Sequence, residues 1–179
     1  AAHATMVLRH FFRRTSPVFV RSRHPMPSTG LDDFIAYLCS QAARAPQGYA
    51  GAAWFMLRTG EDCAHIRLQD IWQPARFLRQ MASIPPHRFA NTGFRPDLVD
   101  DHNPVRHYIA FVFVGFWMPK PLAQMILYAW EVVGFLRYGF TWSQRDVRCG
   151  QVGLRHGAMV RRYAPVILPA VVAAELAAT

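Results

Sequence analysis

The segment from Asn103 to Arg137 constrains the architecture most strongly and reads NPVRHYIAFVFVGFWMPKPLAQMILYAWEVVGFLR. Between positions 107 and 136 it contains only two charged side chains, Lys120 and Glu131. Asparagine followed by proline is a typical helix start, because Asn caps the first turn and Pro has no backbone N–H to leave unpaired. The prolines on either side of Lys120 end one helix and begin another. The stretch therefore predicts two apolar helices joined by a short turn, a helical hairpin at the centre of the fold.

Neither helix of this hairpin reaches the usual length of a membrane span. Each has about 14–16 apolar residues, whereas crossing ~30 Å of hydrocarbon takes about 20. Two interpretations stay open. The helices form the core of a water-soluble bundle, or they pack as a hairpin against membrane-embedded neighbours.

Upstream of the hairpin, Asp32 or Asp33 can cap a helix that runs to about Ala45. The apolar run at 49–58 fits a helix as well as a strand, because a short apolar run has no diagnostic period. Asp70 can begin a further helix with Pro74 in its first turn.

Downstream of the hairpin, Ser143 is followed by Asp146 three positions later, which is typical of a capping box and opens a helix to about Arg162. No internal repeat is present. We expect an all-α fold with one helical bundle domain at 32–163. An extended N-terminal arm at 1–31 precedes it, and an apolar C-terminal tail at 164–179 follows it.

The arm has no acidic residue from Ala1 to Leu31, and it carries Arg9, Arg13, Arg14, Arg21 and Arg23. This composition is typical of organelle-targeting segments or of what remains beside a cleaved one. A processed N-terminus and a cloning scar both explain why the sequence begins at Ala1 without methionine. Its prolines prevent the arm from forming a core by itself, so we expect neighbouring proteins to hold it.

The composition indicates a chain with partners. Hydrophobic residues make up 52% of the 179 residues, charged residues make up only 17%, and the net charge is +9. Such a chain needs a partner or a lipid boundary to cover its apolar surface. Cys39, Cys63 and Cys149 are widely spaced, which argues against a disulfide scaffold and a zinc site.

Four polar residues lie in or beside the apolar helices: Arg106, His107, Glu131 and Asp146. Measured from the turn at a rise of 1.5 Å per residue, His107 and Glu131 lie at the same height to within ~2 Å. A buried Glu is costly unless it is paired, so Arg106 or His107 is its expected partner.

This cluster has two interpretations. A histidine with two carboxylates can act as a general acid and base, or hold a metal. The sequence contains no GxSxG, HExxH, P-loop or GxGxxG motif and no activated nucleophile. We therefore favour a structural polar network that fixes the packing of three helices. The sequence assigns no metal and no cofactor.

The order Asn103-x-x-Arg106-His107, then Glu131, then Asp146-x-x-x-Gly150 resembles a pattern in uncharacterised helical domains. The resemblance covers 97–157 and implies a helical fold built around Arg, His, Glu and Asp. Such domains often have a histidine directly before the glutamate, and here that position is Trp130. It implies no particular activity.

The last long helix carries a second candidate surface. Arginine forks and aromatic rings suit lipid phosphates at a membrane interface, cardiolipin for instance, or an acidic partner. We assign lipid or partner binding to Arg137, Trp142, Arg145, Arg148, Arg161 and Arg162. Gly150, Gly153 and Gly157 share one face of this helix, where another backbone can approach closely.

These features predict a non-catalytic accessory subunit of a large organellar complex, a mitochondrial inner-membrane respiratory or ATP synthase assembly. Its partners are other subunits and anionic lipid, without a small-molecule substrate. One alternative is a helical hydrolase-like enzyme that uses His107, Glu131 and Asp146. Another is an organellar ribosomal protein, which the high apolar content disfavours along with other nucleic-acid binding. A bacterial cytoplasmic location is the alternative to a mitochondrial one.

Overall fold

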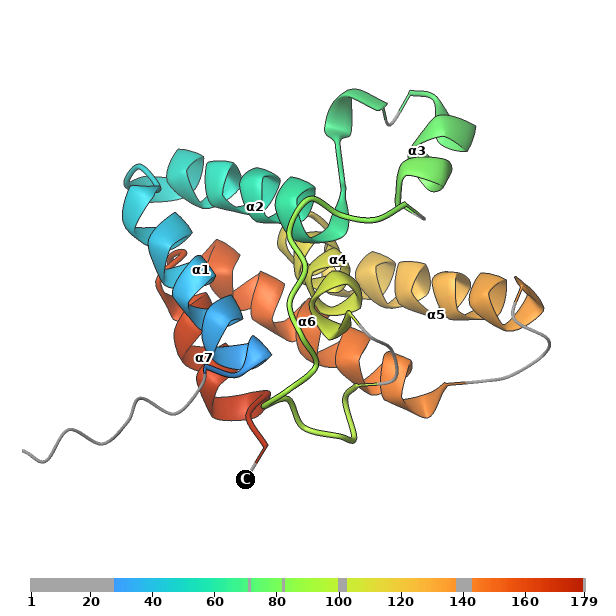
Figure 1. Ribbon diagram of the computed structural model, residues 1–179. Coiled ribbons are helices and arrows are strands. Elements are labelled where there is room, and N and C mark those ends of the chain that lie inside the picture. The colour runs from blue at the N-terminus through green and yellow to red at the C-terminus, as the bar shows by residue number, and fades with distance from the viewer. Residues whose placement is uncertain (1–27, 71, 82, 100–102, 138–142, 179) are drawn as a thin grey trace, which may run out of the picture.

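The computed structural model describes residues 28–70, 72–81, 83–99, 103–137 and 143–178. Every regular element in this part of the chain is a helix, and the prediction of an all-α fold is confirmed there (Figure 1). The elements are α1 (Gly30–Arg44), α2 (Gly48–Ala64), the short 3-10 helix η1 (Leu68–Asp70), α3 (Pro74–Met81), α4 (Pro104–Trp117), α5 (Lys120–Arg137), α6 (Gln144–Arg162) and α7 (Ile167–Glu175). None of the described helices is long and apolar enough to cross a membrane.

Helix α1 begins a few residues earlier than the aspartates indicated. Its N-cap is Thr29, whose Oγ1 accepts a hydrogen bond from the backbone N–H of Asp32 at 3.2 Å. The Asp32 carboxylate in turn accepts from the backbone N–H of Thr29 at 2.9 Å. The expected cap at Asp32 or Asp33 is therefore wrong. Asp32 is the third residue of a reciprocal capping box, and Thr29 supplies the cap.

Two helices, α2 and α3, lie between α1 and α4. The sequence analysis left the first as helix or strand and placed the start of the second too early. The apolar run at 49–58 lies inside α2, so the helical alternative is confirmed. The helix expected from Asp70 is interrupted, because Asp70 ends η1 and α3 begins at Pro74. Proline fits this first position because the first turn of a helix leaves its N–H groups without intrahelical partners.

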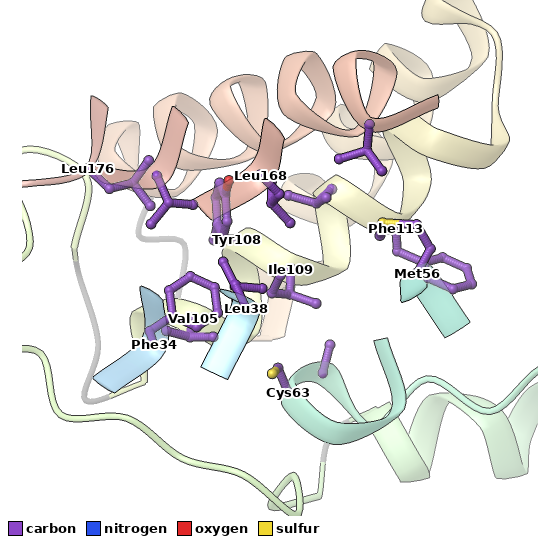
Figure 2. Packing of buried hydrophobic residues seen from close by; sticks show 14 of the residues in the cluster. Phe34, Leu38, Met56, Cys63, Val105, Tyr108, Ile109, Phe113, Leu168 and Leu176 are labelled. Carbon is purple, nitrogen blue, oxygen red and sulfur yellow. The ribbon is translucent and has the colours of Figure 1, made fainter. Parts of the chain in front are cut away.

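Helix α4 occupies the centre of the core. Figure 2 shows buried side chains of α1, α2 and α7 converging on Val105, Tyr108 and Ile109 of α4. These side chains belong to one hydrophobic cluster that includes Phe34 of α1 and Leu168 of α7. The long apolar helix read from the sequence is thus the scaffold on which the other helices pack.

Helices α4 and α6 approach each other closely because glycines face the contact. A Cβ atom added at Gly157 would lie 2.0 Å from the carbonyl oxygen of Val112, and one added at Gly115 would lie 2.2 Å from that of Leu154. Gly153 faces the carbonyl of Tyr108 in the same way. The expectation that the glycines of α6 admit another backbone is confirmed at Gly153 and Gly157. Gly150 instead faces the side chain of Leu127.

Helix α5 lies at the edge of the fold, not at its centre. Its inner side carries the buried residues Ala123 and Leu127, which form a small second cluster with Phe111 of α4 and Leu154 of α6. Its outer side carries several exposed apolar side chains. The two apolar helices therefore have different roles, with α4 in the core and α5 half outside it.

Residues 164–178, expected as an apolar tail, form α7 and its flanks. Leu168, Val172 and Leu176 are buried in the same cluster as α1. Beyond α7, Ala177 makes an isolated antiparallel bridge with Phe94. The segment as far as Leu176 is therefore part of the core, and Ala177 packs against it. The expected N-terminal arm lies, as far as residue 27, outside the described residues.

Candidate functional site

The structure brings three of the four predicted polar residues together. His107 projects from α4, Glu131 from α5 and Asp146 from the first turn of α6. The Nε2 atom of His107 lies 3.7 Å from Oε1 of Glu131 and 2.9 Å from the backbone carbonyl oxygen of Asp146. The helix-rise estimate, which placed His107 and Glu131 at one height, agrees with this geometry.

The hydrogen bond to Asp146 fixes the protonation of one histidine nitrogen. A carbonyl oxygen only accepts, so Nε2 of His107 carries a hydrogen and donates it. At 3.7 Å, Oε1 of Glu131 is too far from Nε2 for a hydrogen bond of normal geometry. His107 therefore faces Glu131 as an electrostatic neighbour.

Glu131 is the unusual member of the cluster. Its side chain is only 8% exposed, and its Oε1 atom has no hydrogen-bond partner among the described residues. Burial, aided by the negative charge of Asp146, raises the pKa of Glu131 to about 7. Close to neutral pH this carboxyl group consequently exchanges between its protonated and ionised forms.

Arg106 lies beside this cluster, but its guanidinium has another partner. It donates through Nη2 to the backbone carbonyl of Met81 at the end of α3. Arg106 thereby joins α3 to α4, and His107 is the closer partner of Glu131. The sequence had left both candidates open.

The cluster lies in the wall of a pocket of about 490 Å³ formed by η1, α3, α4, α5 and the start of α6. Its polar lining consists of Arg106, His107, Glu131, Ser143 and Asp146. The rest of the lining is mostly apolar and includes six aromatic side chains, Phe77, Phe111, Phe113, Trp117, Trp130 and Phe135. A few convergent polar groups in an apolar concavity of this size are typical of small-molecule sites.

Ser143 supplies a hydroxyl group to this lining, and this hydroxyl has a structural role. Its Oγ accepts a hydrogen bond from the backbone N–H of Asp146 at 3.1 Å and caps α6. The prediction that Ser143 is a helix cap is confirmed. Among the described lining residues, the arrangement offers acid and base groups without an activated nucleophile.

The described arginines among those assigned to lipid or partner binding have different surroundings. Arg161 donates through Nη1 to the carbonyls of Phe116 and Met118, at 3.2 and 3.4 Å, and so completes the C-terminal end of α4. The guanidinium of Arg162 lies 5.4 Å from the ring centroid of Tyr163. Arg145 and Arg148 are exposed on α6. Arg137 ends α5 without a described side chain, and Trp142 lies outside the described residues.

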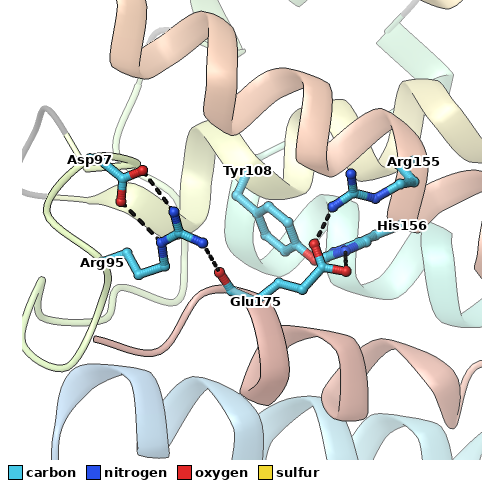
Figure 3. A network of polar contacts seen from close by, with 6 residues as sticks. All are labelled: Arg95, Asp97, Tyr108, Arg155, His156 and Glu175. Carbon is cyan, nitrogen blue, oxygen red and sulfur yellow. Dashed lines mark hydrogen bonds and ion pairs between the residues drawn. The ribbon is translucent and has the colours of Figure 1, made fainter. Parts of the chain in front are cut away.

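A second polar network, which the sequence analysis did not predict, joins α4, α6 and α7 (Figure 3). The hydroxyl of Tyr108 donates to Nδ1 of His156 at 2.8 Å. Nε2 of His156 lies 3.4 Å from Oε1 of Glu175, which also pairs with Arg155. Arg95 donates to the backbone carbonyl of Glu175 and ties the loop before α4 to this network.

The buried position of this network makes it structural. His156 and Tyr108 are fully buried, so solvent does not reach either group. Burial lowers the pKa of His156, and Glu175 opposes this effect in part. A neutral His156 accepts from Tyr108 at Nδ1 and directs its Nε2–H toward Glu175. The network therefore connects three helices without charging the core.

One side of α5 exposes apolar residues to solvent, which the sequence analysis did not distinguish from the buried side of this helix. Leu122, Met125, Tyr128, Val132, Val133 and Leu136 are all exposed there. At 100° per residue these six positions fall within an arc of about 140°, opposite the buried Leu127. Met125 and Leu136 are the most exposed, at 63% and 61%. We call these six residues the α5 face.

Comparisons of this chain with family models, curated proteins and solved structures found no match. The resemblance to helical domains with an Asn-x-x-Arg-His pattern therefore stays a prediction.

Proposed function

We propose that the chain is a non-catalytic accessory subunit of a larger assembly and that it binds a neighbouring subunit through the α5 face. The observation that carries this proposal is the row of six exposed apolar side chains on one side of α5. Contiguous exposed apolar surface of this kind typically marks an interaction site. In this proposal α4 and α5 act as an apolar hairpin, with α4 on the core side and α5 on the partner side.

The chemistry of the face indicates its partner. The charged residues of α5 are Lys120 and Arg137 at its ends and Glu131, which is buried on the inner side. The face itself is uncharged, whereas the whole chain has a net charge of +9. An apolar helix with acidic residues along its edges complements both properties. A mitochondrial inner-membrane respiratory or ATP synthase complex is the setting that we propose, because the acid-free arm at 1–31 is typical of organelle targeting.

The test compares the chain with the double variant Met125→Glu/Leu136→Glu. Both proteins are purified without detergent and analysed by size-exclusion chromatography with light scattering. We expect the parent chain to self-associate and the double variant to be monomeric with the same helical circular dichroism. Ile84→Glu is the matched control, because Ile84 lies outside α5 and is even more exposed, at 71%. It should behave as the parent chain does.

Two outcomes contradict this proposal. A monomeric parent chain that does not change with the double substitution means that the α5 face needs no partner. Binding of the parent chain to cardiolipin-containing vesicles, lost in the double variant, means that the face contacts lipid in place of a subunit.

A hydrolase-like enzyme is the second candidate, because His107, Glu131 and Asp146 line a pocket. Such an enzyme would need an acid or base that is held near neutrality, and the raised pKa of Glu131 meets this requirement. It ranks second because Ser143, the hydroxyl of the described lining, serves as a helix cap. Hydrolysis of an ester probe that is abolished by Glu131→Gln, with unchanged thermal stability, would move it to first place.

A further inference from the structure

The wall of the pocket beside Glu131 contains a carboxylate oxygen that lacks a hydrogen-bond donor among the described residues. Oε1 of Glu131 is buried and has no hydrogen-bond partner among the described residues. A buried acceptor without a donor is destabilising, and more so when the group is charged. Glu131 is part of the pocket wall, but solvent does not reach Oε1, so a molecule in the pocket contacts this atom only when the carboxyl group turns toward it.

The charges around Glu131 favour a cationic donor. The groups that face it are Arg106 and His107 from α4 and Asp146 from α6. The guanidinium of Arg106 donates to the carbonyl of Met81, on the α3 side of the pocket. Asp146 acts on Glu131 as a like charge. A ligand carboxylate would add a third negative group to this end of the pocket, whereas an ammonium would neutralise one.

The remaining lining favours an apolar body with aromatic contacts. Six aromatic side chains line the pocket, among them Trp117 and Trp130. Aromatic faces attract cations as well as apolar groups, and they do so most strongly where water is excluded. The volume of about 490 Å³ lies within the range of small-molecule sites, about 300–1,000 Å³, and leaves room beyond a single amino-acid side chain.

We propose that this pocket binds a lipophilic amine, with its ammonium group donating to the carboxylate of Glu131 and its apolar body among the aromatic rings of the pocket. This site adjoins the α5 face, with which it shares Val133. Met125 and Leu136, on which the docking test depends, are not in the pocket lining. The two proposals therefore fail or succeed separately.

The probe is 4-phenylbutylamine, and its uncharged and anionic counterparts are 4-phenylbutanol and 5-phenylpentanoate. Binding is measured by isothermal titration calorimetry on the full chain and on the monomeric Met125→Glu/Leu136→Glu variant. Tryptophan fluorescence is a second readout, because Trp117 and Trp130 lie in the pocket wall. We expect the amine to bind about 10-fold or more tightly than the alcohol, since hydrogen bonds to a charged group are the stronger ones.

Two variants locate the site. Glu131→Gln keeps the size of the side chain and should weaken amine binding about 10-fold or more, while alcohol binding changes little. Asp33→Asn, which changes an exposed carboxylate on α1, is the control and should change neither. Gly134→Phe should abolish binding of both probes, because Gly134 lines the pocket and a Cβ at this position meets no atom within 4 Å.

The pH dependence supplies an independent readout. Amine binding should weaken by about 10-fold or more between about pH 7.5 and pH 5, because Glu131 gains a proton over this range. The dependence should therefore shrink in Glu131→Gln.

Several results would overturn the proposal. Binding of neither amine nor alcohol removes the site, and equal binding of both removes the role of Glu131. Tighter binding of the carboxylate probe assigns the pocket to anions and to Arg106. Amine binding that survives Gly134→Phe places the bound molecule elsewhere on the chain.

Discussion

The close contact between α4 and α6 makes a quantitative prediction for Gly157→Ala. The added Cβ atom would lie 2.0 Å from the carbonyl oxygen of Val112 and 2.6 Å from the backbone nitrogen of Phe116. Ordinary van der Waals contacts of a Cβ atom begin at 3.4 Å. Both opposing atoms belong to the backbone of α4, so no side chain can rotate away. The two helices must move apart by about 1 Å or more, which loosens the close packing of the core.

The size of the effect follows from two opposing terms. Inserting a group into a packed core typically costs about 1–3 kcal/mol, and a backbone contact on one side puts this site at the upper end. Replacing glycine by alanine in a helix recovers about 1 kcal/mol of helix propensity. The net expectation is a loss of about 2 kcal/mol in the free energy of unfolding. For a chain of this length that corresponds to a fall in Tm of roughly 4–8 °C.

The assay is thermal and urea unfolding followed by circular dichroism, with Gly134→Ala as the matched control. Gly134 is also in a helix, but a Cβ atom added there meets no atom within 4 Å. The same chemical change should therefore stabilise the protein at position 134, by about 0.5–1 kcal/mol. Equal stabilisation by both substitutions would refute the close approach of α4 and α6.

Three further predictions concern the polar groups. Glu131→Gln should stabilise the protein by about 1–3 kcal/mol above pH 7 and have little effect below pH 4.5. The reason is that the raised pKa of Glu131 makes the parent chain lose stability as the pH rises from about 4.5 to 7. Unfolding titrations at several pH values measure this, and an effect that does not depend on pH would contradict it. In the Glu131→Gln background, stability should fall as pH drops below about 6.5, since burial lowers the pKa of His156 in the folded state only, and His156→Gln should remove this loss. Tyr108→Phe should cost about 1–3 kcal/mol by leaving Nδ1 of His156 without its donor, as measured by urea unfolding, and a cost below that of an average exposed substitution would show that the hydrogen bond is dispensable.

Local signals in the sequence predicted the starts of α4 and α6. Asn103 and Pro104 open α4, and Ser143 caps α6, because both signals act within a single helical turn. The cap of α1 was placed wrongly for a related reason. Thr29 and Asp32 hydrogen-bond to each other's backbone in a capping box. Both residue types can cap a helix, so the sequence pattern alone does not tell the cap from its partner.

The part of the candidate site that depends on the helical rise from a single turn could be predicted from the sequence. His107 and Glu131 lie at similar distances from one turn, so the helical rise alone places them side by side. The Tyr108–His156 pair joins residues 48 positions apart in different helices, and nothing in the sequence pattern fixes that contact. The edge position of α5 was equally hidden. Its outer side carries exposed apolar residues such as Met125 and Val132. A fully buried helix carries the same residue types, so the sequence does not distinguish the two positions.

The contact between α1 and α7 has a consequence for the synthesis of the chain. Phe34 and Leu38 of α1 belong to the same buried cluster as Leu168 and Val172 of α7. About 120 residues separate the two helices, which takes on the order of 10 s to translate at about 5–20 residues per second. During that interval α1 has emerged while its packing partner does not yet exist. Its apolar side is then a natural substrate for chaperones, and completion of the core is a late event.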